Sequence, residues 1–175
     1  MLLQLSACAV RSYRLSDAKS LPKYANDRSV WLNLRDAFPH PYTSDDAKAF
    51  ITRATGAQPE TNFAISVNDE AVGGVGFSLH TDVERISAEI GYWLGAPFRG
   101  KGITTEALRA VTHYAINQHH LKRVYAVPYE WNVASFKVLE KAGYSLEGRM
   151  RQSAFKDGKV IDQLLYAFVV EENDA

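Results

Sequence analysis

Residues 92–104 read Tyr-Trp-Leu-Gly-Ala-Pro-Phe-Arg-Gly-Lys-Gly-Ile-Thr, and the interpretation of the whole chain starts from them. The stretch passes from an apolar strand, through a loop with three glycines, into a segment with helical periodicity. A helix start gathers backbone N–H groups without intrahelical partners and the positive end of the helix dipole. Gly100 and Gly102 let the backbone approach a ligand closely, and Arg99 and Lys101 add positive charge. The stretch therefore predicts a cradle for a pyrophosphate group.

Three other interpretations of this loop are a tight turn without a ligand, a nucleotide P-loop and a dinucleotide-binding fingerprint. A tight strand-to-helix turn without any ligand would use the same glycines, because short glycine motifs are weak signals. A nucleotide P-loop would need a Gly-Lys-Ser/Thr ending, and a dinucleotide fingerprint would need three glycines at a different spacing. Residues 99–104 satisfy neither pattern.

The pattern of apolar residues on both sides of this loop predicts an alternation of strands and helices. The spacing of Ala107, Leu108, Val111 and Ala115 predicts a helix with one buried face over residues 103–119. The other expected strands are 9–15, 62–67, 71–79, 88–94, 124–127, 144–155 and 159–170, and the other expected helices are 18–25, 30–34, 44–56 and 132–142. This order predicts an α+β domain built around one predominantly antiparallel sheet.

Composition limits the classes of protein and partner. The 175 residues predict a single domain over 1–175, with 46% hydrophobic residues for its core. Twenty basic residues balance twenty acidic ones, so we expect no nucleic-acid partner and no membrane partner. Cys8 is the single cysteine, which excludes an intrachain disulfide and a multi-thiolate metal site. We expect a cytoplasmic protein without a bound metal.

Three motifs in the same order resemble those of GNAT acetyltransferases, in particular the Rim-type branch that includes ribosomal-protein N-terminal acetyltransferases. Residues 99–104 resemble the acetyl-CoA signature Arg/Gln-x-x-Gly-x-Gly/Ala, with Glu89 to Leu94 before it and Glu106-Ala107-Leu108 after it. Residues 132–135 and 139–144 resemble the second signature of this branch, and residues 39–47 its acceptor-side loop. Thr104 departs from the pattern, which usually has a smaller Gly or Ala there.

The resemblance implies a GNAT fold with about seven strands, flanked by helices, in which a splayed strand pair holds acetyl-CoA. The pantetheine would pair with the backbone of Tyr92, Trp93 and Leu94. The implied pyrophosphate-binding and channel-facing residues are Arg99, Gly100, Lys101, Gly102, Ile103, Thr104, Asn132 and Ser135. An ordinary N-cap role explains Asn132 equally well.

The resemblance also implies direct acetyl transfer to a primary amine. Ser135 would protonate the departing thiolate, although a hydroxyl in the first turn of a helix also bonds free N–H groups. Glu89 would act as the base, directly or through water, and its alternative is a carboxylate at the wet end of a strand. Trp31 and Tyr42 would line the acceptor pocket.

The last part of the prediction is the amine that accepts the acetyl group. We expect a protein or peptide N-terminal α-amine, with a small amine such as a polyamine, an aminoglycoside or an amino acid as the alternative. Some ribosomal-protein acetylating relatives carry a Glu late in the closing hairpin, where this chain has Ala154. A non-catalytic acyl-CoA-binding module is the competing class, and a homodimer is a further expectation from similar proteins.

Overall fold

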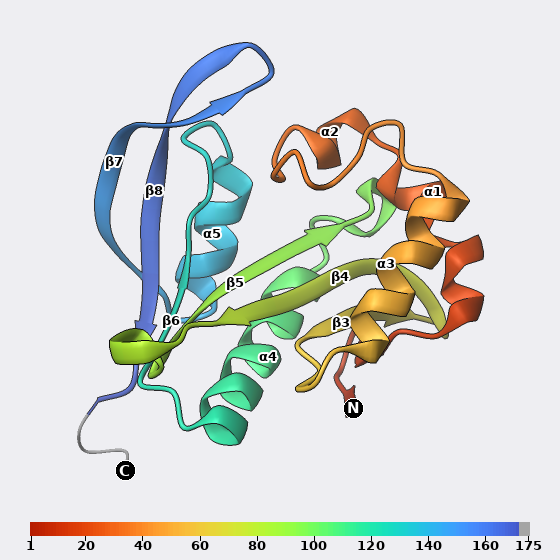
Figure 1. The fold of residues 1–175 in the computed structure, drawn as a ribbon, viewed down its shortest axis with the longest axis horizontal. Helices are drawn as coiled ribbons and strands as arrows, with labels where there is room; N and C mark the ends of the chain where they lie inside the picture. Colours follow the sequence, from red (N-terminus) through yellow and green to blue (C-terminus); the bar gives the residue numbers. More distant parts are fainter. Residues whose placement is uncertain (172–175) are drawn as a thin grey trace. The chain divides into compact units, whose positions relative to one another are not determined.

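Eight strands and their flanking helices make up the computed structural model, which describes residues 1–171 (Figure 1). The strands are β1 (Leu2–Gln4), β2 (Ala9–Ser12), β3 (Asn62–Val67), β4 (Glu70–Leu79), β5 (Ser87–Leu94), β6 (Arg123–Ala126), β7 (Ser145–Lys156) and β8 (Lys159–Val169). The α-helices are α1 (Leu21–Ala25), α2 (Arg28–Trp31), α3 (Ser44–Gly56), α4 (Ile103–His119) and α5 (Val133–Lys141). Three short 3-10 helices are η1 (Leu15–Lys19), η2 (Asp82–Glu84) and η3 (Ala96–Phe98).

The strands follow the order β1-β2-β3-β4-β5-β6-β8-β7 in one sheet. β5 and β6 run parallel, whereas the pairs β1–β2, β2–β3, β3–β4, β6–β8 and β7–β8 are antiparallel. The predicted fold class, an α+β fold around a mixed and mostly antiparallel sheet, is confirmed. The sheet has eight strands rather than about seven, because β1 has three residues and is too short to show an alternating pattern.

The chain forms two compact units. Unit 1 comprises Met1–Gly76 and Tyr92–Ala107, and unit 2 comprises Phe77–Gly91 and the chain from Leu108 onward. β4, β5 and α4 contribute residues to both units. The single domain expected over residues 1–175 stays a prediction, and residues 172–175 lie outside the described part of the chain.

In unit 1, one face of α3 packs on the sheet. Thr43 and Asp46 form a capping box that starts this helix, and Ala47, Ile51 and Ala54 point into the core. These three residues are three or four positions apart, so they lie on one face, and they pack with Ala64 of β3. The helix expected at 18–25 is divided into η1 and α1, because Pro22 is tolerated only in the first turn of a helix.

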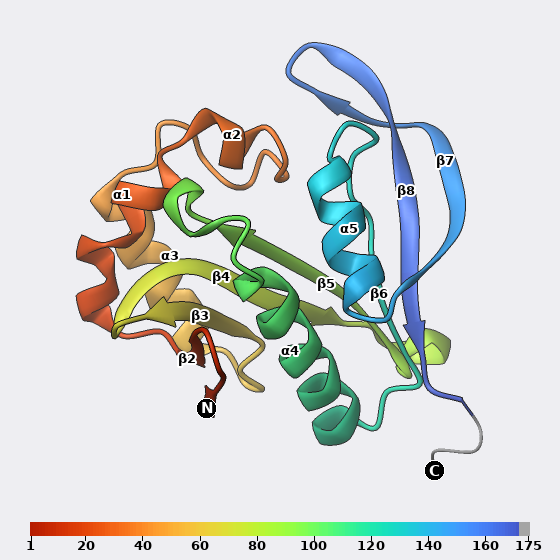
Figure 2. The same ribbon diagram turned by 180° about the vertical axis from the view of Figure 1, so that it is seen from behind.

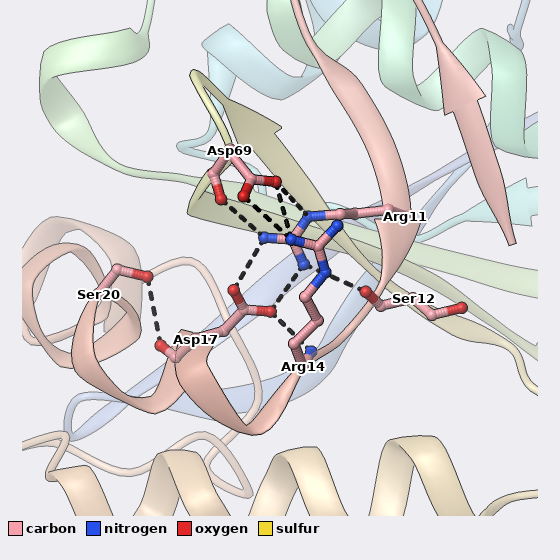
Figure 3. Close-up of polar contacts among 6 residues, drawn as sticks. All are labelled: Arg11, Ser12, Arg14, Asp17, Ser20 and Asp69. Carbon is pink, nitrogen blue, oxygen red and sulfur yellow. Dashed lines mark hydrogen bonds and ion pairs between the residues drawn. The ribbon is translucent and has the colours of Figure 1, made fainter.

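A buried ion pair in unit 1 joins β2 to η1. Figure 2 shows β2 beside β3, and Figure 3 shows Arg11 of β2 facing Asp17 of η1. Two hydrogen bonds of 2.8 Å join their side chains, and Arg11 also donates to the carbonyl oxygen of Asp69 at 3.0 Å. The hydrogen bond with Asp17 raises the pKa of Arg11, so the guanidinium stays charged although it is buried.

In unit 2, the parallel ladder between β5 and β6 covers three residues of each strand, Ser87–Glu89 and Arg123–Tyr125. β5 then continues to Leu94, five residues past the end of this ladder. β8 pairs with the other edge of β6. β7 pairs with β8, and the turn at Asp157-Gly158 connects these two strands. The early end of the ladder agrees with the strand splay that the resemblance implies.

Candidate functional site

The loop between β5 and α4 has the geometry of an anion cradle. Gly100 and Gly102 have φ values of +75° and +79°, a backbone conformation that residues with a Cβ rarely adopt. A Cβ built on either glycine would meet no atom within 4 Å, so the space over this backbone is open. α4 begins at Ile103, and the first four N–H groups of a helix have no partner within it. These features fit a pyrophosphate group, as the sequence predicts.

The two cationic side chains of this loop make contacts within unit 1. Arg99 donates from Nε to the Leu94 carbonyl oxygen and from Nη1 to the Ser29 hydroxyl, both at 3.0 Å. The Lys101 ammonium lies 5.8 Å from the centre of the Phe98 ring. Arg99 therefore ties the loop to the end of β5 and to α2.

Glu106, in the first turn of α4, contacts the turn between β1 and β2. The Glu106 carboxylate accepts hydrogen bonds from the Ser6 amide at 2.8 Å, the Ser6 hydroxyl at 2.6 Å and the Ala7 amide at 3.0 Å. The Glu106 amide itself donates to the Gly102 carbonyl oxygen at 3.0 Å. The turn between β1 and β2 is thereby clasped to the first turn of α4. Nothing in the local sequence signals this contact, because its partners are about one hundred residues apart.

The end of β5 packs closely on β4. A Cβ on Gly73 would lie 2.5 Å from the Trp93 carbonyl oxygen, and one on Gly74 would lie 2.8 Å from the Trp93 indole nitrogen. Two adjacent glycines in a strand mark such a close approach, so this signal was present in the sequence. Leu94 is buried, whereas Tyr92 and Trp93 are half-buried.

The two residues expected in the acceptor pocket differ in their surroundings. Trp31, at the end of α2, is half-buried and stacks on His40 with ring centres 5.8 Å apart. Tyr42 is only 5% exposed and stacks on Phe38 at 4.9 Å. Burial raises the pKa of Tyr42 to about 12, so its phenol keeps its proton at neutral pH. Tyr42 is a core residue of unit 1, and Trp31 presents more surface.

The expected base and acid both lie in unit 2. Glu89 is half-buried on β5, in register with Tyr125 on β6. Asn132 caps α5, and its side-chain oxygen accepts a hydrogen bond from the Ser135 amide at 3.2 Å. Ser135 is 9% exposed. The N-cap role of Asn132 is thus observed, and it does not exclude a role in ligand binding.

Across residues 1–171, no three His, Cys, Asp or Glu side chains gather as ligands for a metal ion. None of the helices in that range combines the length and apolar character needed to cross a bilayer.

Comparison with known families agrees with the fold. The family described as "Acetyltransferase (GNAT) domain" matches residues 9–145. The chain therefore belongs to the GNAT acetyltransferases.

Individual relatives of the chain are bacterial N-acetyltransferases. It is 26% identical to the uncharacterized N-acetyltransferase YnaD of Bacillus subtilis (strain 168), over 93% of this chain and 94% of YnaD. It is 32% identical to the ribosomal-protein-serine acetyltransferase of Escherichia coli (strain K12), over 62% of this chain and 60% of that enzyme. The structure of Mycobacterium smegmatis RimJ in complex with CoA-disulfide superimposes with a TM-score of 0.85 at 24% identity, covering 98% of this chain and 87% of RimJ.

Proposed function

We propose that this protein transfers an acetyl group from acetyl-CoA to a primary amine, preferably the N-terminal α-amine of a protein or peptide. The observation that carries the proposal is the open, positive-φ backbone at Gly100 and Gly102 directly before α4. A solved neighbour, RimJ, holds a form of CoA, and a sequence relative is named as a ribosomal-protein-serine acetyltransferase. A protein that modifies ribosomal proteins would work in the cytoplasm.

Acetyl-CoA is the acetyl donor in this proposal, and the chain's own residues bind and orient it. The backbone of Tyr92, Trp93 and Leu94 binds the pantetheine. The pyrophosphate is bound by residues 99–104, which are Arg99, Gly100, Lys101, Gly102, Ile103 and Thr104. Asn132 and Ser135 are further donor-binding residues. The first four N–H groups of α4 supply hydrogen-bond donors without needing extra side chains.

Chemically, three groups carry the proposed transfer. Glu89 removes a proton from the acceptor ammonium, directly or through water. Backbone N–H groups near Gly91 and Tyr92 stabilise the charge on the carbonyl oxygen as the amine attacks. Ser135 gives a proton to the departing thiolate. Trp31 lines the acceptor pocket, and Tyr42 supports it from the core.

An α-amine suits this arrangement better than a lysine side chain does. An N-terminal amine has a reference pKa of about 7.7–8.0, so roughly a tenth is neutral at pH 7. A lysine amine has a pKa of about 10.4, so only on the order of four parts in ten thousand are neutral. An α-amine therefore needs less deprotonation by a single half-buried carboxylate such as Glu89 than a lysine side chain does.

Thiol release from acetyl-CoA across a panel of amines tests the proposal. The panel holds peptides beginning with Ala, Ser, Thr or Met, together with polyamines, aminoglycosides and free amino acids. Release with one peptide class supports the proposed acceptor, and release with only a small amine keeps the chemistry but replaces the acceptor. No release from any amine, with CoA still bound, favours the non-catalytic acyl-CoA-binding module.

Two variants test the proposed acid. Ser135→Ala should lower kcat by about a hundredfold, which is typical for loss of a general acid, with the CoA dissociation constant within about threefold of wild type. Ser145→Ala, at an exposed position on β7, is the matched control and should keep the wild-type rate. Equal rates for the two variants would remove Ser135 from the mechanism.

Sedimentation of the same wild-type sample tests the expected homodimer.

A further inference from the structure

Two aromatic side chains meet above β5 in unit 2. His80 directly follows β4, and its amide donates to the Ser87 carbonyl oxygen at 3.2 Å. Its Nε2 lies 2.9 Å from the hydroxyl oxygen of Tyr125, on β6. The two rings stack with centres 5.7 Å apart and planes 5° from parallel. β5 runs between β4 and β6 in the sheet, so this contact bridges over it.

The pair lies beside Glu89. Ser87 and Glu89 are two residues apart on β5, so their side chains share one face of the sheet. Glu89 is the register partner of Tyr125, and His80 is bonded to Ser87. Ser87 is only 9% exposed. The proposed base and the His80–Tyr125 pair therefore occupy adjacent positions on one face of three neighbouring strands.

Arg123 of β6 is a charged residue in contact with the pair. The Arg123 guanidinium lies 5.6 Å from the centre of the Tyr125 ring and forms an ion pair with Glu147 of β7, with one hydrogen bond of 2.7 Å. Glu84 of η2 approaches through its backbone, whose carbonyl oxygen accepts from the Ser87 hydroxyl at 3.0 Å. From β8, the register partner of Tyr125 is Ala167, which carries no charge. Arg123 therefore already has a carboxylate partner in Glu147.

We propose that Tyr125 and His80 carry away the proton that Glu89 takes from the acceptor amine. This inference rests on the proposed function, in which Glu89 is the base. The acceptor N–H bond breaks and a Glu89 O–H bond forms; that proton then moves to the Tyr125 hydroxyl as the hydroxyl gives its own proton to His80 Nε2. The imidazolium then loses its Nδ1 proton to water, and exchange of the remaining ring proton with water restores the tautomer with its proton on Nδ1, so all three groups return to their starting forms.

The residue types suit this step. A histidine has a reference pKa of about 6.5, so it gains and loses a proton near neutral pH. The neutral imidazole with its proton on Nδ1 leaves Nε2 to accept from the tyrosine, and His80 is half-buried, so part of this residue contacts water. Since both side chains act through Glu89, they are positioning residues for the reaction.

Kinetics of Tyr125→Phe and His80→Gln test the proposal, with acetyl-CoA and the peptide that the panel shows to be turned over fastest. Each variant should lower kcat by about tenfold or more, move the acidic limb of the pH–kcat profile, and leave KM for acetyl-CoA unchanged. Added imidazole should restore part of the rate to His80→Ala. His113→Gln, at an exposed position on α4, is the control and should match wild type. Unchanged kcat and pH profiles in both variants would overturn the proposal.

A measurement of the His80 tautomer by NMR in the free protein needs no acceptor. The proposed step requires Nε2 to accept the hydrogen bond from Tyr125, so the neutral ring should carry its proton on Nδ1. A neutral ring with its proton on Nε2 would overturn the proposed relay. Failure of the proposed function gives a different result, which is no thiol release by the wild-type protein with any amine in the panel.

Discussion

Replacing Gly102 by alanine separates the cost of backbone strain from the loss of a binding site. Gly102 has φ of +79°, and a Cβ there would meet no atom within 4 Å, so the substitution introduces strain without a clash. An L-residue in this region costs roughly 1–2 kcal/mol, which for a protein of this size corresponds to a melting temperature about 2–8 °C lower. Gly158, with φ of +76° and equally open surroundings, lies in the turn between β7 and β8 and is the matched control.

Only one of these two variants should affect binding of the acetyl donor. A backbone that relaxes at residue 102 turns its amide away from the bound phosphate. One hydrogen bond to a charged group contributes about 1.5–3 kcal/mol, and 1.4 kcal/mol is a factor of ten. Gly102→Ala should therefore weaken CoA binding about tenfold or more in isothermal titration calorimetry, whereas Gly158→Ala should bind CoA as wild type does.

Melting temperature and CoA affinity together distinguish a binding cradle from a simple turn. Equal losses of melting temperature with a selective loss of CoA affinity in Gly102→Ala are the expected result. If Gly102→Ala shows the stability loss but binds CoA within threefold of wild type, the loop is a strand-to-helix turn and no cradle.

Further predictions concern the contacts that hold unit 1 together. Glu106→Gln should lower the free energy of unfolding by about 1 kcal/mol, because uncharged acceptors bind the Ser6–Ala7 turn less well; unchanged thermal unfolding would show that the clasp contributes nothing. Asp17→Ala should cost about 3–5 kcal/mol in urea denaturation, since it leaves the Arg11 guanidinium buried without its partner, and Arg11→Met together with Asp17→Leu should cost clearly less. Hydrogen bonds from Thr43 lower the pKa of Asp46, so this carboxylate stabilises the fold above its unfolded-state pKa near 3.9, and the benefit is lost as the pH falls through the lower folded-state pKa. Thr43→Ala should therefore be less stable than wild type at pH 7, and a difference that did not narrow below about pH 4 would contradict this assignment.

Periodicity and turn chemistry account for the elements that were predicted correctly. The expected ranges 103–119 and 62–67 match α4 and β3, because long or strongly patterned segments bury one continuous stripe or face. Thr43 with Asp46, Asn132, and the Asp157-Gly158 turn are local signals, and each lies where the sequence places it. Short elements without periodicity, such as β1, were missed.

The sequence by itself determined the order of elements, the position of the glycine loop before α4, and the family resemblance that the comparisons confirm. These depend on neighbours within a few residues, whose spacing is visible in the chain. The tertiary structure alone decided which distant residues meet: Arg11 with Asp69, Ser6 with Glu106, and His80 with Tyr125. Such contacts depend on strand order and register, and a register change of one residue turns every side chain of a strand to the other face.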